Sequence, residues 1–116
     1  MRFVTIIAVF TASLLGGSFV HPLDFHGSKQ EKSKVLTYIK DDVKKKYAAI
    51  NMDDPLTLRM MEKKNLEAFK KLMHAKDRAV LDSVIKTYCA IDMCDYLTIE
   101  MMYRKQIGAK KEKLKW

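Results

Sequence analysis

The chain has 116 residues, of which 48% are hydrophobic and 31% charged, and its formal net charge is +8. This length allows one small domain, and the apolar content excludes a disordered chain. Two cysteines are too few for a disulfide-rich toxin scaffold, and four glycines and two prolines exclude collagen-like and low-complexity chains.

The first 18 residues have the pattern of a secretory signal peptide. Arg2 supplies a positive charge, an uncharged apolar run follows it, and small residues at 16–18 end the segment. We expect cleavage after Ser18, and after Val20 at the latest. The alternative is a membrane anchor over 3–20, a stretch at the short limit for spanning a bilayer.

Cleavage after Ser18 would release a basic chain with a net charge of +7, because the leader contains one arginine and no acidic residue. We expect residues 19–32 of this chain to form a flexible amino-terminal arm. Residues 33–116 have helical patterning and are expected to form a single helical domain.

The strongest signal in this domain is an internal repeat. Residues 47–64 align without a gap with residues 88–105 at an offset of 41, and ten of the 18 aligned positions are identical. Repeats of about this length with helical patterning are typical of helix–turn–helix units. The sequence therefore predicts two tandem units of about 41 residues, over 36–76 and 77–116.

Each unit contains two apolar stripes at helical spacing. The stripes of the first unit are Leu36, Ile39, Val43, Tyr47 and Ile50, then Leu58, Met61, Leu66, Phe69, Leu72 and Met73. Those of the second unit are Leu81, Val84, Ile85 and Tyr88, then Ile99, Met102, Tyr103 and Ile107. Asp54 and Asp95 follow the turns and are expected to cap the second helices. We predict an all-α fold in which the two units pack as a small four-helix bundle.

Both units also carry apolar residues on the side of the second helix opposite the main stripe. These are two i,i+4 pairs at equivalent positions, Leu56 with Met60 and Leu97 with Met101. They could touch each other across the two units inside the core. Alternatively, they could stay exposed and bind a partner together with the neighbouring Lys63 and Lys64, since methionine-rich faces adapt to different ligands.

The two cysteines, Cys89 and Cys94, flank the turn of the second unit. In an oxidising compartment, we expect a disulfide across this turn, worth about 2 kcal/mol in the chain-entropy model because the closed loop is short. Their spacing differs from the C-x-x-C motif of thiol oxidoreductases. No second pair of ligands stands nearby, so no metal site is expected.

The sequence has no catalytic motif that we can identify, and neither an enzyme activity nor a cofactor is expected. It lacks a G-x-S-x-G motif, a glycine-rich phosphate loop and an H-E-x-x-H motif. Its basic surplus is consistent with a solvated face, with attraction to an anionic surface, or with nucleic-acid binding or nuclear import through the carboxy-terminal tail. Lysine outnumbers arginine and the aromatic residues lie on the apolar stripes, so no specific nucleic-acid readout is expected.

The leader at 1–15 and the small, cysteine-poor format without enzyme motifs resemble candidate effector proteins of filamentous fungi. This resemblance implies secretion, a role in virulence and action outside the cell or after translocation into host cells.

The favoured hypothesis is a secreted, non-catalytic effector that binds a host or extracellular protein. The alternatives are a carrier of a lipid or small apolar ligand, and a cationic membrane-active protein. A filled core with exposed methionines would favour protein binding, whereas a sizeable closed apolar cavity would favour the carrier.

Overall fold

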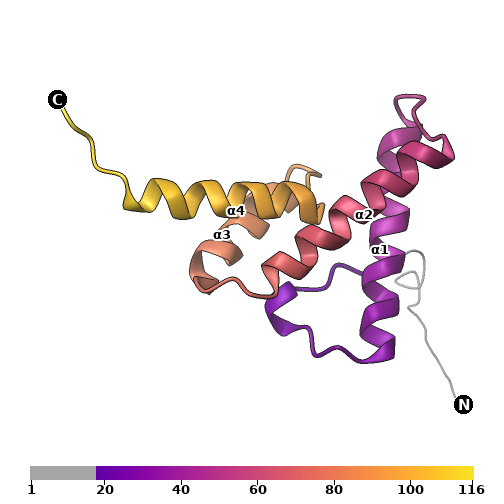
Figure 1. Cartoon of the computed structure of the whole chain (residues 1–116), viewed down its shortest axis with the longest axis horizontal. Helices are drawn as coiled ribbons and strands as arrows, with labels where there is room; N and C mark the ends of the chain where they lie inside the picture. The colour runs from indigo at the N-terminus through magenta and orange to yellow at the C-terminus, as the bar shows by residue number, and fades with distance from the viewer. Residues whose placement is uncertain (1–17) are drawn as a thin grey trace, which may run out of the picture.

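The computed structural model describes residues 18–116, which form four α-helices and one short 3₁₀-helix, with no strand among them (Figure 1). The elements are η2 (Pro22–Asp24), α1 (Lys29–Ala48), α2 (Pro55–Leu72), α3 (Arg78–Cys89) and α4 (Tyr96–Lys111). The predicted all-α fold is therefore confirmed. The predicted signal peptide lies, up to residue 17, outside the described residues.

Polar side chains cap the amino-terminal ends of all four α-helices. Asp54, Asp77 and Asp95 accept hydrogen bonds from backbone N–H groups at the starts of α2, α3 and α4. Ser28 and Glu31 form a reciprocal capping box at the start of α1. These caps satisfy N–H groups that have no partner within the helix, so the local sequence places the helix starts.

The two turns within the hairpins have the same backbone geometry. Asn51 and Asp92 adopt positive φ angles of 58° and 60°, a conformation that short polar residues tolerate. The residue after each of them donates its backbone N–H to a tyrosine carbonyl. Met52 donates to Tyr47 over 2.8 Å, and Met93 donates to Tyr88 over 2.9 Å. The turn geometry thus recurs at the offset of 41, whereas the duplication of whole units stays a prediction.

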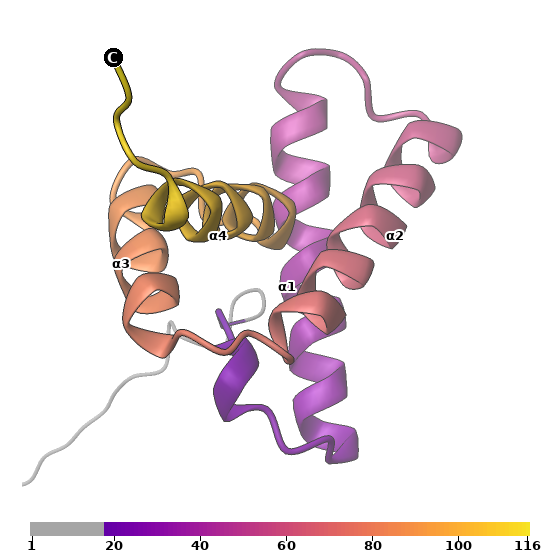
Figure 2. The ribbon, with the colours of Figure 1, turned by 60° about the vertical axis from the view of Figure 1, so that its left-hand side comes forward.

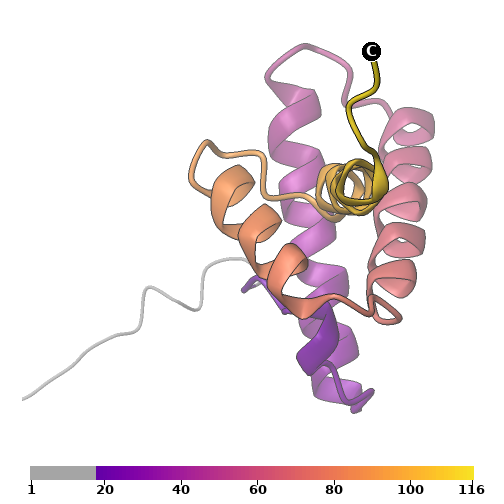
Figure 3. The same ribbon diagram turned by 90° about the vertical axis from the view of Figure 1, so that its left-hand side faces the viewer.

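The helices are arranged as two hairpins, α1–α2 and α3–α4, with α4 running across the first hairpin (Figures 2 and 3). α2 packs against both α1 and α4, and α3 packs against α4. The buried apolar core draws on all four helices and comprises Val35, Ile39, Val43, Leu58, Ala68, Phe69, Leu72, Leu81, Val84, Tyr96 and Ile99. The arrangement is compatible with a small four-helix bundle.

The predicted stripe on α1 is wrong at both ends. Val35 is buried in place of Leu36, which is 41% exposed, so the buried positions of α1 are spaced four residues apart. Ile50 is 58% exposed because α1 ends at Ala48 and the chain turns away from the core there.

The flexible arm expected over 19–32 does not match the structure either. Residues 29–32 form the first turn of α1. Pro22 is fully buried, and the Phe19 ring stacks on Tyr96 with centroids 5.1 Å apart. The Val20 backbone donates to the Tyr96 hydroxyl over 3.0 Å and accepts from it over 2.8 Å. The segment is held in place because its apolar residues pack against the core.

Candidate functional site

The predicted contact residues on α2 lie at the surface. Leu56 is 78% exposed and Met60 is 48% exposed, and both follow the capped start of the helix. Lys63 and Lys64, one turn further along, are also exposed. The alternative that placed Leu56 and Met60 inside the core is therefore wrong.

Their counterparts on α4 have different surroundings. Leu97 packs against the core, and its N–H donates to the side-chain oxygen of Asn65 over 3.0 Å. Met101 remains 37% exposed. The start of α4 thus abuts the middle of α2, where Asn65 is buried and also donates to the Met61 carbonyl. The only sequence signal for this contact was a polar residue in the middle of an apolar stripe.

Exposed apolar side chains in the two turns were missed by the sequence reasoning. Ile50 and Met52 in the first turn, and Ile91 and Met93 in the second, are large and exposed. Each pair flanks the residue with positive φ, so the tight turn prevents both side chains from reaching the core. An apolar residue on each side of a turn-forming Asn or Asp is the signal that could have revealed them.

The predicted disulfide is present between Cys89 and Cys94, whose Cα atoms are 4.2 Å apart. It joins the end of α3 to the residue before the Asp95 cap and closes the turn. The Tyr38 hydroxyl of α1 donates to the Cys94 carbonyl over 2.6 Å, so the same turn is also attached to the first hairpin.

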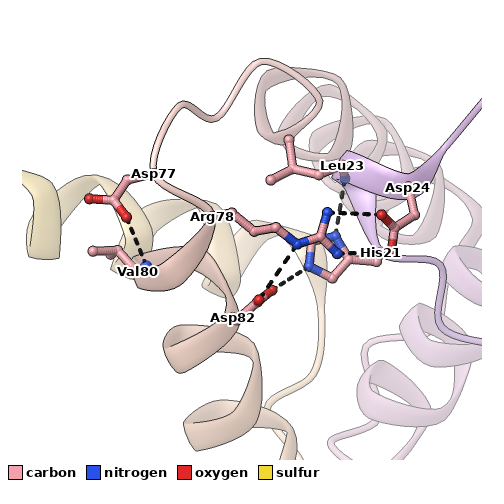
Figure 4. A network of polar contacts seen from close by, with 7 residues as sticks. All are labelled: His21, Leu23, Asp24, Asp77, Arg78, Val80 and Asp82. Carbon is pink, nitrogen blue, oxygen red and sulfur yellow. Dashed lines mark hydrogen bonds and ion pairs between the residues drawn. The ribbon is translucent and has the colours of Figure 1, made fainter.

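A polar cluster fastens the amino-terminal segment to α3 (Figure 4). We call His21, Asp24, Arg78 and Asp82 the clasp. The Arg78 guanidinium donates to both oxygens of Asp24, over 2.9 and 3.0 Å, and this hydrogen bonding holds the Asp24 pKa below its usual range. Arg78 is 54 residues from Asp24 in the chain, and Asp82 is 61 residues from His21. No local sequence pattern therefore predicts the clasp.

The hydrogen bonds of His21 favour one tautomer of its neutral ring. The Leu23 N–H donates to His21 Nδ1 over 3.1 Å, and His21 Nε2 lies 2.6 Å from Asp82 Oδ1. Because Nδ1 accepts, the proton of the neutral ring belongs on Nε2, where it is donated to the carboxylate. Both ring nitrogens are thus engaged, and we assign the clasp a structural role.

A second polar cluster links α1 to the start of α4. Lys46 Nζ lies 3.2 Å from Asp42 and 3.1 Å from Asp95. Burial raises the pKa of Asp42, and the charge of Lys46 opposes this shift. The second Asp95 oxygen accepts from the Thr98 N–H over 2.8 Å. Each of these charged groups therefore has a protein partner, and the cluster joins the two hairpins.

The described residues show neither a membrane span nor a metal site. No helix within residues 18–116 combines the length and apolar character needed to cross a bilayer. The same residues contain no group of three or more His, Cys, Asp or Glu side chains placed to hold a metal ion. Comparison of the chain with protein-family models, curated proteins and solved structures gives no match.

Proposed function

We propose that this chain is a secreted, non-catalytic binding protein, a host-directed effector that engages a protein partner. The contact surface is the exposed side of α2, which we call the α2 surface and define as Leu56, Met60, Lys63 and Lys64.

The observation that carries the proposal is the exposure of Leu56 and Met60 at the capped start of α2. A 78% exposed leucine next to a 48% exposed methionine leaves apolar area that binding can remove from water. The Asp54 cap and Pro55 hold this backbone before any partner arrives, so little conformational entropy is lost on binding. Lys63 and Lys64 add a basic margin suited to a partner with acidic residues beside an apolar pocket.

Secretion is supported by two features of the chain. The Cys89–Cys94 disulfide suits an oxidising compartment. Phe19, the residue that follows the predicted cleavage position, also packs its ring against Tyr38 and Tyr96. Cleavage after Val20 would remove the backbone groups that bond to Tyr96, so this packing favours cleavage after Ser18.

The test uses the chain that cells secrete into culture medium. Mass spectrometry of this intact chain identifies the cleavage site. A photo-crosslinking residue at position 56 should capture one partner from host tissue, and the same residue at the exposed Thr87 of α3 should not. The captured partner is then purified and its affinity measured. The L56S/M60S variant should bind at least tenfold more weakly, since two central apolar contacts are lost.

A matched variant controls for general loss of apolar surface. L36S removes another exposed leucine, one on α1, and should bind the purified partner as the native chain does. Unchanged circular dichroism in both variants shows that the fold is intact. Equal affinity of L56S/M60S and the native chain would overturn the proposal.

A further inference from the structure

A groove of about 510 Å³ is lined by the amino-terminal segment, the first half of α1 and the last half of α2, two helices that pack against each other in the first hairpin. This volume is in the range of small-molecule sites. Its lining residues are Phe25, Lys32, Val35, Leu36, Leu66, Phe69, Lys70, Met73 and His74. None of the residues of the α2 surface lines it, so an inference about the groove does not depend on the proposed function.

The floor and walls of the groove are apolar. Val35 and Phe69 are buried core residues, and the Phe25 ring meets Phe69 edge-on, with centroids 5.2 Å apart. Leu36, the residue after Val35 on α1, forms part of one wall and is 41% exposed. Met73 adds a flexible side chain that adjusts to irregular shapes. A hydrocarbon chain laid in this groove would rest on the buried Val35 and Phe69 and remove the exposed part of Leu36 from water.

The charged residues of the groove all have the same sign. They are Lys32 from α1 and Lys70 from α2, both exposed, and no acidic residue is among the lining residues. Neither lysine side chain has an ion pair or hydrogen bond to another described residue, whereas Lys44, Lys46 and Lys110 each pair with a carboxylate. The groove therefore offers two uncompensated ammonium groups beside an apolar floor.

From this combination, we propose that the groove binds a single-chain fatty acid. The acyl chain lies along Val35, Phe69 and Met73, and the carboxylate lies between the ammonium groups of Lys32 and Lys70. The apolar floor accounts for the hydrocarbon chain and the two free lysines account for the anionic head, so neither a neutral lipid nor a small polar anion satisfies both parts of the groove.

Binding is measured with 11-(dansylamino)undecanoate, whose emission rises in an apolar site, followed by displacement with unlabelled saturated carboxylates below their micellar concentrations. Dodecanoate should displace the probe. Affinity should rise about fourfold for each methylene added between octanoate and dodecanoate, because each buried methylene contributes a constant increment. Dodecyl maltoside, which has the same chain and an uncharged head, should compete much more weakly.

Variants test the two parts of the groove separately. K32Q/K70Q should bind dodecanoate about tenfold more weakly, since two exposed charge contacts are lost, and high salt should weaken native binding in the same direction. K40Q/K86Q removes the same charge from exposed lysines outside the groove and should bind as the native chain does. L36D, which changes an already exposed side chain, should abolish binding by placing a carboxylate in the wall.

Three outcomes would overturn the proposal. They are unchanged affinity in K32Q/K70Q, equal competition by dodecanoate and dodecyl maltoside, and binding to vesicles of anionic phospholipid without binding to free dodecanoate. L56S/M60S should bind dodecanoate with native affinity. Failure of the fatty-acid proposal can therefore be distinguished from failure of the proposed protein contact at the α2 surface. Circular dichroism checks that each variant is folded.

Discussion

The two hairpins start their second helices in the same way but place these starts in different surroundings. Asp54 caps α2 and Asp95 caps α4, each through the N–H of a threonine three residues later. The next residue is the exposed Pro55 in the first hairpin and Tyr96, 0% exposed, in the second. The same local structure thus lies at the surface in one hairpin and in the core in the other.

Tyr96 is the residue that makes this difference. Its ring contacts those of Phe19, Tyr38 and Phe69, with centroids 5.1, 5.6 and 4.8 Å away. Its hydroxyl bonds to both backbone groups of Val20, and burial raises its pKa well above the usual value. The proline in the equivalent place, Pro55, is exposed and offers neither an aromatic ring nor a hydrogen-bond donor.

The turn of the second hairpin is also more firmly closed than the turn of the first. The second turn is closed by the Cys89–Cys94 disulfide, whereas the first has Lys44 and Asp53 3.3 Å apart in an exposed ion pair. Exposed ion pairs contribute little to stability. In the second hairpin, the turn is closed by the disulfide and the start of α4 is fixed in the core by Tyr96. In the first hairpin, the start of α2 leaves Leu56 at the surface.

The largest effect is expected from removing the tyrosine. Tyr96→Ala should lower the free energy of unfolding by about 3–5 kcal/mol, the usual cost of truncating a large buried aromatic residue. Tyr96→Phe, which removes only the hydroxyl, should cost about 1–2 kcal/mol. Pro55→Ala, the equivalent change in the first hairpin, should cost less than about 1 kcal/mol. Urea denaturation checks all three, and equal costs at the two positions would contradict the comparison.

An intermediate effect is expected from the disulfide. C89S/C94S should lower the free energy of unfolding by about 2 kcal/mol, because the unfolded chain regains the freedom of a short loop. The matched variant A48C/D53C places cysteines at the equivalent positions of the first turn, whose backbone geometry is the same. Urea denaturation under oxidising conditions should show a gain of similar size for this variant. No gain would mean that the two turns differ more than their backbones indicate.

The smallest effect is expected at the clasp, and it depends on pH. Arg78 holds the pKa of Asp24 below its usual range, so the folded chain favours the ionised carboxylate. This contribution to stability is present above about pH 4 and is lost as the pH falls through the lowered pKa. Asp24→Asn should therefore lower the urea midpoint at pH 7, and the difference from the native chain should shrink on acidification.

A double variant controls this experiment. In an Arg78→Gln background, Asp24→Asn should no longer change the urea midpoint in a pH-dependent way, because the partner that stabilises the carboxylate is absent. A persistent pH-dependent difference in that background would show that another group, and not Arg78, stabilises Asp24.

The helices of this protein could be predicted from the sequence because their signals are local. Asp54 and Asp95 act on N–H groups three residues away, and Cys89 and Cys94 are separated by one turn. The error at Val35 has a different origin. Val35 and Leu36 both stand at helical spacing from Ile39, four and three residues before it, so periodicity alone cannot choose between them. The choice depends on how α2 crosses α1, which is a property of the packed chain.

Most of each helix, the two turns, the aspartate caps and the disulfide follow from the sequence, because these depend on interactions over a few residues. Packing of the whole chain selects which of two similar hairpin ends is buried. It also determines where the amino-terminal segment lies, since Val20 meets Tyr96 across 76 residues of chain. The α2 surface and the basic groove are further consequences, because exposure and concavity depend on how segments distant in the sequence pack against one another.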